Sequence, residues 1–229
     1  MFYFDWTFLI LIPAMLVSMY AQAKLTSTYS TYSQVRNRHG YTGADVAQML
    51  LSKNGINDVR VEYIKGNLTD HYDPTAKVIR LSDAVYSQTS VAALGVAAHE
   101  TGHAIQDNVG YAPLRFRHAL FPITNLSSKM ALPIFMLGLF FGTTSGILMQ
   151  IGIYLFAFTV LFQLVTLPVE FNASSRALDI LEDAKILEPD EIKPAQKVLA
   201  AAALTYVAAA FTAILNLVRL LVIARNRND

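Results

Sequence analysis

The sequence contains no cysteine and few charged residues: only 15% of its 229 residues are Asp, Glu, Lys or Arg. The absence of cysteine excludes disulfide bridges, thiolate nucleophiles and thiolate metal ligands. An ordinary soluble domain has about 25% charged residues, so this chain is poor in charge for its size. The net charge is only +1, whereas proteins that bind nucleic acids typically have a clear excess of basic residues. We therefore expect no nucleic-acid partner.

Hydrophobic residues are abundant, at 54% of the chain, and they form long runs. A bilayer core of about 30 Å requires roughly 20 apolar residues in a helix. The first run covers residues 6–23. The Ala21-Gln22-Ala23 pattern resembles a signal-peptide cleavage site, but no Lys or Arg precedes the run, which favours a retained membrane anchor.

Two further apolar blocks follow. Residues 130–169 contain no charge, and the only cluster of helix breakers inside them is Gly142–Gly146, where we expect a turn between two spans. The first arm of this pair is short unless it extends back past Lys129, so a re-entrant segment is the alternative. Residues 198–224 contain only Arg219 as a charge and form the last span. The sequence therefore predicts four transmembrane helices.

Lysine and arginine residues near the ends of the spans predict the orientation. They are frequent in segments 24–129 and 168–197, and absent from the N-terminus and from the turn at 142–146. The positive-inside rule therefore places both hydrophilic segments in the cytoplasm, although Arg225 and Arg227 oppose this orientation. Because two spans separate the two segments, both lie on the same side of the membrane whichever way the protein is inserted.

The segment between the first two spans has the pattern of a small α+β unit. Residues 24–41 form either a linker or a polar extension of the first helix, and Thr42 begins a helix with a capping-box pattern. Alternating residues predict strands at 59–64 and 78–81. Ser90 is the expected N-cap of a long helix that continues to about Asp107.

The long helix carries the motif His99-Glu100-Thr101-Gly102-His103. Residues four apart lie on one helix face, so both imidazoles can reach a single Zn²⁺ ion. Glu100 lies one step around the helix and can take a proton from a zinc-activated water, which makes it the expected general base. Two histidines and a glutamate buried without partners among small residues would be costly, which argues against a chance occurrence.

A catalytic zinc requires a third protein ligand. His118 is a weak candidate, because the spacing of a third metal-binding histidine in metzincins would require one at position 109, where Val109 stands. Glu170 is the better candidate, since it follows the third span directly and lies on the same side of the membrane as His99 and His103. We expect it to begin an amphipathic helix, after Pro168, that runs to about Leu187. On the residues alone, an alternative explanation of Glu170 is equally plausible: a negative charge is stabilising near the start of a helix, and the residue then has no role in metal binding.

Several motifs together resemble the YugP-type neutral zinc metallopeptidases. They occur in order at Leu68–Pro74, Val91–Asp107, Gly110–Pro113 and Leu167–Ser174, and the resemblance covers the chain from about Thr42 to the final span. This family is similar in plan to the HtpX-like membrane proteases, in which two membrane helices also separate the two histidines from a glutamate ligand. The resemblance implies that His99, His103 and Glu170 bind zinc and that Glu100 is the base.

The chain departs from the related patterns at two positions. HtpX-like enzymes have an acidic residue four positions after the ligand glutamate, where this chain has Ser174. A hydroxyl can accept the same hydrogen bond from a zinc-binding histidine but carries no charge, so the affinity for the metal can differ. Asn172 stands where many YugP-type sequences are expected to have Asp.

Residues near the second strand are further candidates. In the resembling enzymes the strand at 78–81 is an edge strand that pairs with extended substrate. His71 or Tyr72 could stabilise the oxyanion of a tetrahedral intermediate, although a turn held by Asp70 and Asp73 explains these residues slightly better. Arg176 points about 120° away from Glu170 around the helix, which favours a surface or headgroup role.

These observations predict a mainly α-helical membrane protein with a small zincin-like α+β catalytic unit that contains a short edge sheet. The expected organisation is a transmembrane anchor (1–24), a zincin-like catalytic region (25–125), two transmembrane helices (126–168), a third-ligand helix (169–194), and a final transmembrane helix and tail (195–229).

The expected function is that of a membrane-embedded zinc endopeptidase with one Zn²⁺ per chain. Its expected partners are the lipid bilayer and membrane or membrane-adjacent protein substrates, with the active site on the cytoplasmic side of the cell membrane. Two alternatives are an intramembrane site-two-type protease and a non-catalytic zinc-binding scaffold. The polar residues after His103 oppose the first, and an intact Glu100 opposes the second, since a structural zinc site requires no base.

Overall fold

The computed structural model describes residues 6–141 and 146–228. The chain forms two compact units, which are treated separately below. Unit 1 consists of residues 1–21, 116–167 and 205–229, and unit 2 of residues 22–115 and 168–204. The elements are η1 (Trp6–Leu11), α1 (Ile12–Tyr32), α2 (Gly43–Lys53), β1 (Arg60–Tyr63), β2 (His71–Asp73), β3 (Val78–Leu81), α3 (Val91–Asn108), α4 (Ala112–Phe140), α5 (Gly146–Asp183) and α6 (Pro189–Asn228).

Four helical segments of the described chain are long and apolar enough to cross a membrane: Trp6–Tyr32, Ala112–Phe140, Gly146–Asp183 and Pro189–Arg227. The prediction of four spans is therefore confirmed. The first arm of the central pair extends back to Ala112 as a full helix of 29 residues, which does not support the re-entrant alternative. The turn predicted at Gly142–Gly146 lies mainly outside the described residues.

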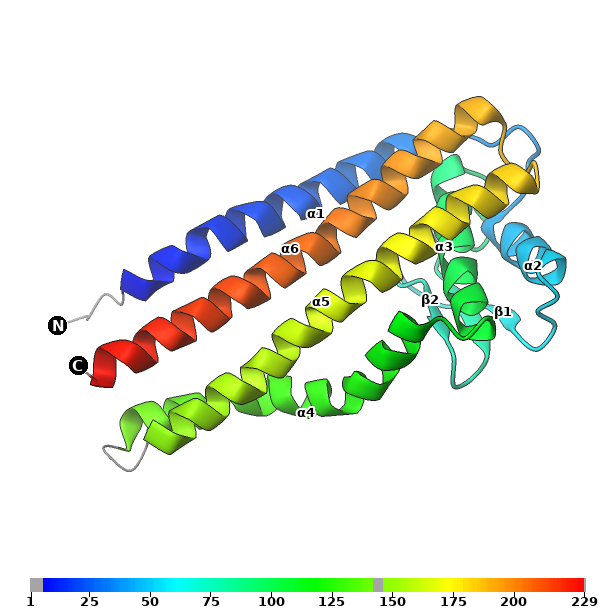
Figure 1. The fold of residues 1–229 in the computed structure, drawn as a ribbon. Coiled ribbons are helices and arrows are strands. Elements are labelled where there is room, and N and C mark those ends of the chain that lie inside the picture. The colour runs from blue at the N-terminus through cyan, green and yellow to red at the C-terminus, as the bar shows by residue number, and fades with distance from the viewer. Residues whose placement is uncertain (1–5, 142–145, 229) are drawn as a thin grey trace. The chain divides into compact units, whose positions relative to one another are not determined.

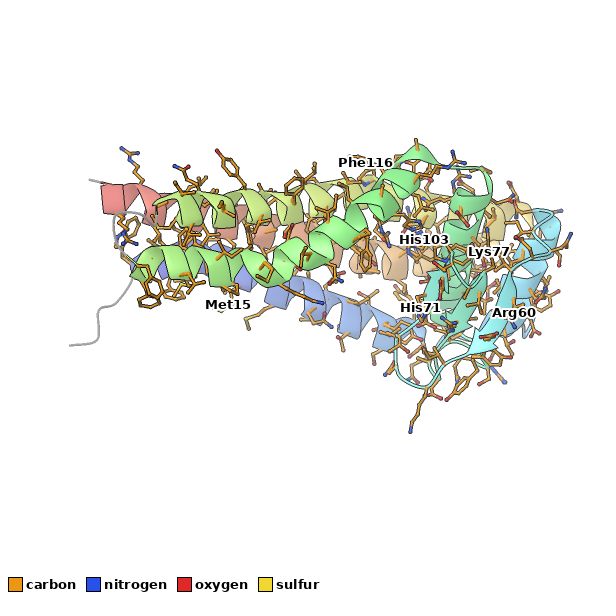
Figure 2. The ribbon with its side chains drawn as sticks, turned by 90° about the horizontal axis from the view of Figure 1, so that it is seen from below. Met15, Arg60, His71, Lys77, His103 and Phe116 are labelled. Atoms are coloured by element: carbon orange, nitrogen blue, oxygen red, sulfur yellow. The ribbon has the colours of Figure 1, made fainter. Side chains whose placement is uncertain are left out.

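Unit 1 has an apolar surface. Large hydrophobic side chains point outward from its helices, among them Met15 and Phe116, which are at least half exposed (Figure 2). Its small buried cluster contains Phe135, Met149 and Leu220 from three different helices. Exposed apolar side chains around a small core are expected where lipid, not water, surrounds the helices.

The first helix continues as α1 to Tyr32, so residues 24–32 are a polar extension of it, whereas 33–41 connect it to α2. Helix α2 begins as the sequence predicted. The Thr42 side chain accepts a hydrogen bond from the Asp45 backbone N–H, and Asp45 accepts from the Thr42 backbone N–H. These two hydrogen bonds satisfy the backbone N–H groups of Thr42 and Asp45, which have no partner within the helix, and they fix the start of α2.

Unit 2 is built around α3, which contacts α2 and the sheet (Figure 1). One buried cluster joins α2 and α3 to the parts of α5 and α6 in this unit, through residues such as Leu50, Leu94 and Leu181. A second cluster joins α2 and α3 to the sheet, through Ile79 and Leu81. Helix α3 is therefore packed on several sides, which holds its side chains in place.

The sheet has three strands in the order β1-β3-β2, with β1 parallel and β2 antiparallel to β3. The expectation that the strand at 78–81 is an edge strand is wrong: β3 lies in the centre, and β2 is an edge. The reason is that His71–Asp73, expected to form a turn, is itself a short strand that pairs with Val78–Arg80. Three residues are too few to show an alternating pattern in the sequence.

Helix α5 is continuous through Pro168 and ends at Asp183. The expectation of a separate helix that begins after Pro168 and runs to about Leu187 is therefore wrong in both bounds. Proline removes one backbone donor but is tolerated in membrane helices when neighbouring groups satisfy the freed carbonyls. The chain turns after Asp183, where Lys185 adopts a positive φ of 51°, and α6 begins at Pro189.

Candidate active site

The site is built on α3, whose start is well defined. The Ser90 side chain caps the helix by accepting a hydrogen bond from the Ala93 backbone N–H at 3.2 Å. Much of the helix consists of alanine and glycine, and most of its residues are buried. Small side chains allow neighbouring elements to approach closely, so the larger polar side chains of the motif project into space that those elements bound.

Gly102 allows α3 to lie against α5. A Cβ atom at this position would lie 2.7 Å from the carbonyl oxygen of Ala173, closer than real Cβ atoms approach. Ala173 is three residues after Glu170, so this contact lies next to the expected third ligand. The glycine in the middle of the motif therefore has a packing role that its position between the two histidines did not reveal.

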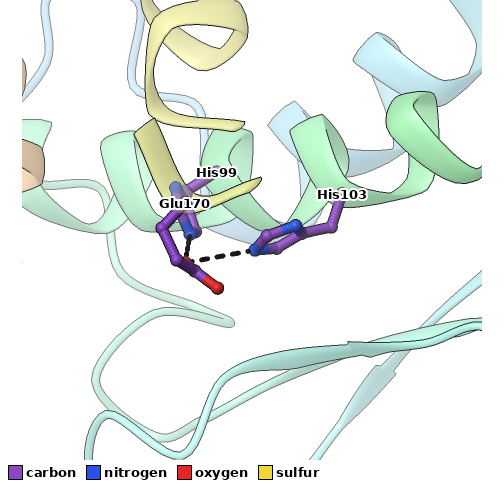
Figure 3. A group of neighbouring side chains, drawn as sticks. All are labelled: His99, His103 and Glu170. Carbon is purple, nitrogen blue, oxygen red and sulfur yellow. Dashed lines mark ion pairs between the residues drawn. The ribbon is translucent and has the colours of Figure 1, made fainter. Parts of the chain in front are cut away.

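Three side chains converge at this contact (Figure 3). The Glu170 Oε2 atom lies 3.3 Å from His99 Nε2 and 3.5 Å from His103 Nε2. All three side chains are largely buried, with exposed fractions of 13% for His99, 11% for His103 and 3% for Glu170. The structure thus brings together the three residues that the sequence proposed as metal ligands, from two helices far apart in the chain. His118, the weaker candidate, is not a member of this group.

The geometry of the three atoms fits a zinc ion. Tetrahedral ligands at 2.0–2.1 Å from zinc lie about 3.3–3.4 Å from one another. The two measured distances are close to this value, and all three atoms lie within 4.8 Å of each other. Two imidazoles and one carboxylate are also the ligand set of many catalytic zinc sites, which leave the fourth position open.

Glu100 lies on the same helix and is 8% exposed. Burial raises the pKa of its carboxyl group to about 7, because the charged form loses contact with water. The nearby Glu170 adds to this rise, whereas His99 and a hydrogen bond from the Tyr72 backbone N–H oppose it. A divalent cation beside the Glu100 carboxylate would also lower its pKa, because the positive charge favours the charged form.

Gln106 determines which nitrogen of His103 carries the proton. Its Nε2 donates to the Val169 carbonyl at 2.8 Å, and a carbonyl can only accept, so the other amide atom is the oxygen. That oxygen lies 3.0 Å from His103 Nδ1 and therefore accepts from an Nδ1–H group. The lone pair of His103 is then on Nε2, the atom that faces Glu170. Sequence reasoning did not identify Gln106, although its position three residues after His103 places both on one helix face.

His99 has a corresponding partner on α5. The Ser174 hydroxyl lies 3.2 Å from His99 Nδ1, the contact that its place one turn after Glu170 suggested. A hydroxyl that accepts from Nδ1–H leaves His99 Nε2 free to bind a metal, in the same way as Gln106 does for His103. Both histidines are therefore oriented by hydrogen bonds to their outer nitrogens.

A polar network extends from Gln106 along α5. Gln106 Nε2 also donates to Asn172 Oδ1 at 3.0 Å, and Arg176 Nε donates to the same oxygen at 2.8 Å. Arg176, expected at the surface, is half-buried and engaged in this network. The network joins α3 to α5 on either side of Glu170.

The other two candidates make different contacts. The ring nitrogens of His71 lie 2.9 Å from the Thr69 carbonyl and 3.3 Å from the Arg80 guanidinium. The Tyr72 hydroxyl donates to Asp107 at 2.8 Å, and burial, together with this hydrogen bond, raises the pKa of Tyr72. These contacts favour a structural interpretation of both side chains, although their roles in catalysis stay predictions.

Comparisons with known proteins agree with this geometry. The model of a family described as "Putative neutral zinc metallopeptidase" matches residues 7–225. The chain belongs to this family. A "Putative membrane protease YugP" from Bacillus subtilis (strain 168) is 46% identical over 218 residues, which cover 95% of this chain and 96% of the relative. No solved structure matches.

Membership of the family establishes the general function. The chain is a zinc metallopeptidase, and its four apolar helices make it a membrane protein. Zinc is its cofactor, and the grouped His99, His103 and Glu170 side chains are the candidate site. The resemblance identified from the sequence motifs is thereby confirmed.

Proposed function

We propose that this peptidase is an endopeptidase that binds one zinc ion through His99, His103 and Glu170 and uses Glu100 as its general base. The observation that supports this assignment is the convergence of Nε2, Nε2 and Oε2 at distances of 3.3 and 3.5 Å, with a buried glutamate beside the first histidine. When bound there, zinc supplies a Lewis acid that activates water and polarises the scissile carbonyl.

Glu100 moves the proton. Its carboxylate takes a proton from water as the bond to the scissile carbon forms and delivers it to the leaving nitrogen as the peptide bond breaks. Burial raises the pKa of Glu100, whereas a divalent cation beside the carboxylate would favour the charged form, which is the form that accepts the proton from water. Gln106 and Ser174 hold the two histidines, so the ligand geometry needs little rearrangement.

Substrate binding involves β2. In the described part of the chain, this strand contacts α3 and is paired with another strand on one side only, whereas β3 is paired on both sides. An extended peptide can add to a free sheet edge through its backbone groups, which requires no particular side chains. In this proposal the substrate therefore pairs with β2 and not with β3, the strand at 78–81 that the sequence analysis expected at the edge.

The location of the site limits its substrates. We place the site on the cytoplasmic side of the cell membrane, because the segments that carry His99, His103 and Glu170 are flanked by lysines and arginines. The lipid bilayer and membrane or membrane-adjacent proteins are then the partners within reach.

A Glu100→Gln variant tests the mechanism. Peptides blocked at both ends and carrying an internal quenched fluorophore report endopeptidase cleavage only. We expect the variant to bind one zinc per chain but to lose at least about a hundredfold in turnover, since the general base is gone. Glu182→Gln, a change of the same kind at an exposed position, is expected to retain activity. Turnover that survives in Glu100→Gln would contradict the mechanism.

Zinc content tests the ligands separately. The purified wild type is expected to contain one zinc per chain, and His99→Ala and Glu170→Ala to lose it or bind it far more weakly. Zinc retained without Glu170 would direct the search for the third ligand to His71 or His118. A wild type without zinc would contradict the proposed site.

A further inference from the structure

Strand β2 is attached to α3 by polar contacts as well as by apolar packing. It lies against α3 (Figure 1), and its central residue, Tyr72, packs on the buried cluster that joins the sheet to α2 and α3. The Tyr72 hydroxyl donates to Asp107 Oδ2 at 2.8 Å. Asp107 follows Glu100 by seven residues on α3, so both acidic residues lie on one face of the helix, about 10 Å apart along its axis.

Asp107 accepts from a second residue of the same hairpin. Lys77, in the turn between β2 and β3, donates from Nζ to Asp107 Oδ2 at 2.8 Å, whereas it lies 3.9 Å from Asp58 Oδ2. The Asp107 side chain is only 24% exposed, so water and salt screen this ion pair less than a pair at the surface. One carboxylate oxygen therefore ties two residues of the hairpin to α3.

The backbone of Tyr72 faces the proposed general base. Its N–H donates a hydrogen bond to the Glu100 carboxylate, so this N–H points away from β3. The N–H and C=O of one residue point to the same side of an antiparallel pair, so the Tyr72 carbonyl also faces the edge of β2 opposite β3. Tyr72 is thus attached to α3 at two points, through its backbone at Glu100 and through its hydroxyl at Asp107.

We propose that Tyr72 and Asp107 are positioning residues for the substrate: they hold β2 beside α3 so that the backbone groups of Tyr72 are preorganised to pair with an extended peptide. This inference rests on the proposed function, in which substrate adds to the edge of β2. A strand that is already fixed loses little conformational entropy when a peptide pairs with it. A substrate carbonyl that accepts from the Tyr72 N–H replaces Glu100 as its acceptor, which leaves that carboxylate available to water.

A loosened β2 should affect substrate binding more than chemistry. Backbone pairing with the strand is made in the substrate complex and in the transition state alike, and the loss of such an interaction raises KM while kcat stays the same. Neither Tyr72 nor Asp107 belongs to the group of proposed zinc ligands, so the zinc content should not change. A split between KM and kcat therefore distinguishes positioning of the substrate from damage to the metal site.

Kinetics of the full-length protein with the blocked, internally quenched peptide test the proposal. We expect Tyr72→Phe to raise KM about three- to tenfold, the usual effect of one hydrogen bond, with kcat changed by less than about twofold. Asp107→Ala should raise KM at least as much. The double variant should raise it no further than Asp107→Ala, because both changes remove the same hydrogen bond. Asp107→Asn keeps an oxygen that can accept from the Tyr72 hydroxyl, and it should recover most of the wild-type KM.

Tyr63→Phe is the matched control. Tyr63 lies on β1, at the other edge of the sheet, and its hydroxyl donates to Asp83, so this change also removes one hydrogen bond between a tyrosine and an aspartate. We expect it to leave KM at the wild-type value. An equal rise of KM in Tyr63→Phe and Tyr72→Phe would show a general effect of sheet stability and would overturn the proposal.

Two further kinetic results would also overturn it: an unchanged KM in Tyr72→Phe and Asp107→Ala, or a fall in kcat alone, which would show that these residues act on Glu100 and not on the substrate. Amide hydrogen exchange of residues 71–73 without substrate is a readout that requires no activity. We expect faster exchange in Tyr72→Phe than in Tyr63→Phe, and equal exchange would contradict the positioning role. Activity that survives in Glu100→Gln contradicts the proposed function instead, so the two failures are distinguishable.

Discussion

At the scale of single residues, the site depends on hydrogen bonds to the outer nitrogens of its histidines. A metal can bind His103 at Nε2 only if the proton is on Nδ1, and the buried Gln106 enforces this tautomer. The same amide donates to the backbone carbonyl of Val169, the residue before Glu170. The Gln106 side chain thus orients His103, a proposed ligand on α3, and ties it to the part of the α5 backbone that carries the proposed ligand Glu170.

We predict that Gln106→Met weakens zinc binding by about 10- to 100-fold, the usual effect of losing an outer partner of a metal ligand. Methionine has a similar length but cannot accept from Nδ1–H, so His103 loses its orientation. Zinc affinity measured against a competing chelator gives the change. Gln88→Met makes the same replacement at an exposed residue and should bind zinc normally. An unchanged affinity in Gln106→Met would show that the amide does not position His103.

Ser174 provides a second test at this scale. We predict that Ser174→Ala binds zinc more weakly than the wild type, whereas Ser174→Asp binds it more tightly, because an anionic acceptor makes His99 a more basic ligand. The measurement is again the zinc affinity, at constant pH. Ser175→Ala, a change at the exposed neighbouring position, is the control. The opposite order of the Ala and Asp variants would contradict the proposed contact.

At the scale of elements, the close approach of α3 and α5 decides whether the three proposed ligands meet. Glu170 reaches the two histidines because Gly102 leaves room for the backbone of α5 at Ala173. Gly95, seven residues earlier on α3, faces Ala195 of α6 with more space, since a Cβ there would lie 3.6 Å from the nearest atom. A side chain therefore has room at Gly95 but not at Gly102, although both glycines lie on α3.

We predict that Gly102→Ala destabilises the protein by about 1–3 kcal/mol, as overpacking of a close contact does, and also weakens zinc binding, because α5 must move away together with Glu170. Gly95→Ala should have little effect on either quantity, since its new methyl group makes ordinary contacts. Thermal unfolding with and without zinc measures both changes. Equal behaviour of the two variants would show that the contact at Gly102 does not control the site.

The predicted elements were most accurate where local signals were strong. The capping residues Thr42 and Ser90 and the bounds of β3 agree with the sequence analysis. The errors occurred where tertiary contacts overrode local signals. Pro168 indicated a helix boundary, but α5 continues through it within the fold, and β2 becomes a strand only because β3 is available to pair with it.

At the scale of the whole molecule, the number of spans between the two halves of the site decides whether both halves lie on the same side of the membrane. Helices α4 and α5 both have the length and composition of spans, and two spans return the chain to the side from which it started. The proposed ligands His99 and His103 on α3 precede this pair, and the proposed ligand Glu170 follows it. The parity argument requires only that both segments lie on the same side of the membrane, and the grouping of the three side chains agrees with that requirement.

The absence of cysteine makes the orientation directly measurable. We predict that Ser52→Cys and Lys193→Cys, both at exposed positions of unit 2, react with a membrane-impermeant maleimide only after cells are permeabilised. Thr143→Cys, in the turn predicted between the second and third spans, should react in intact cells. Labelling of Ser52→Cys in intact cells would reverse the proposed orientation, and different labelling of Ser52→Cys and Lys193→Cys would contradict the count of two spans between them.

The sequence by itself determined the membrane class, the four spans, the metal-binding motif and the family resemblance. These follow from local composition and spacing, which depend on residues close together in the chain. Only the tertiary structure decided that the carboxylate of Glu170 lies within 3.3–3.5 Å of both imidazoles, that Gln106 and Ser174 orient them, and that Gly102 permits the contact. These features arise between residues distant in the chain, and they depend on how closely two helices approach, which no local pattern encodes.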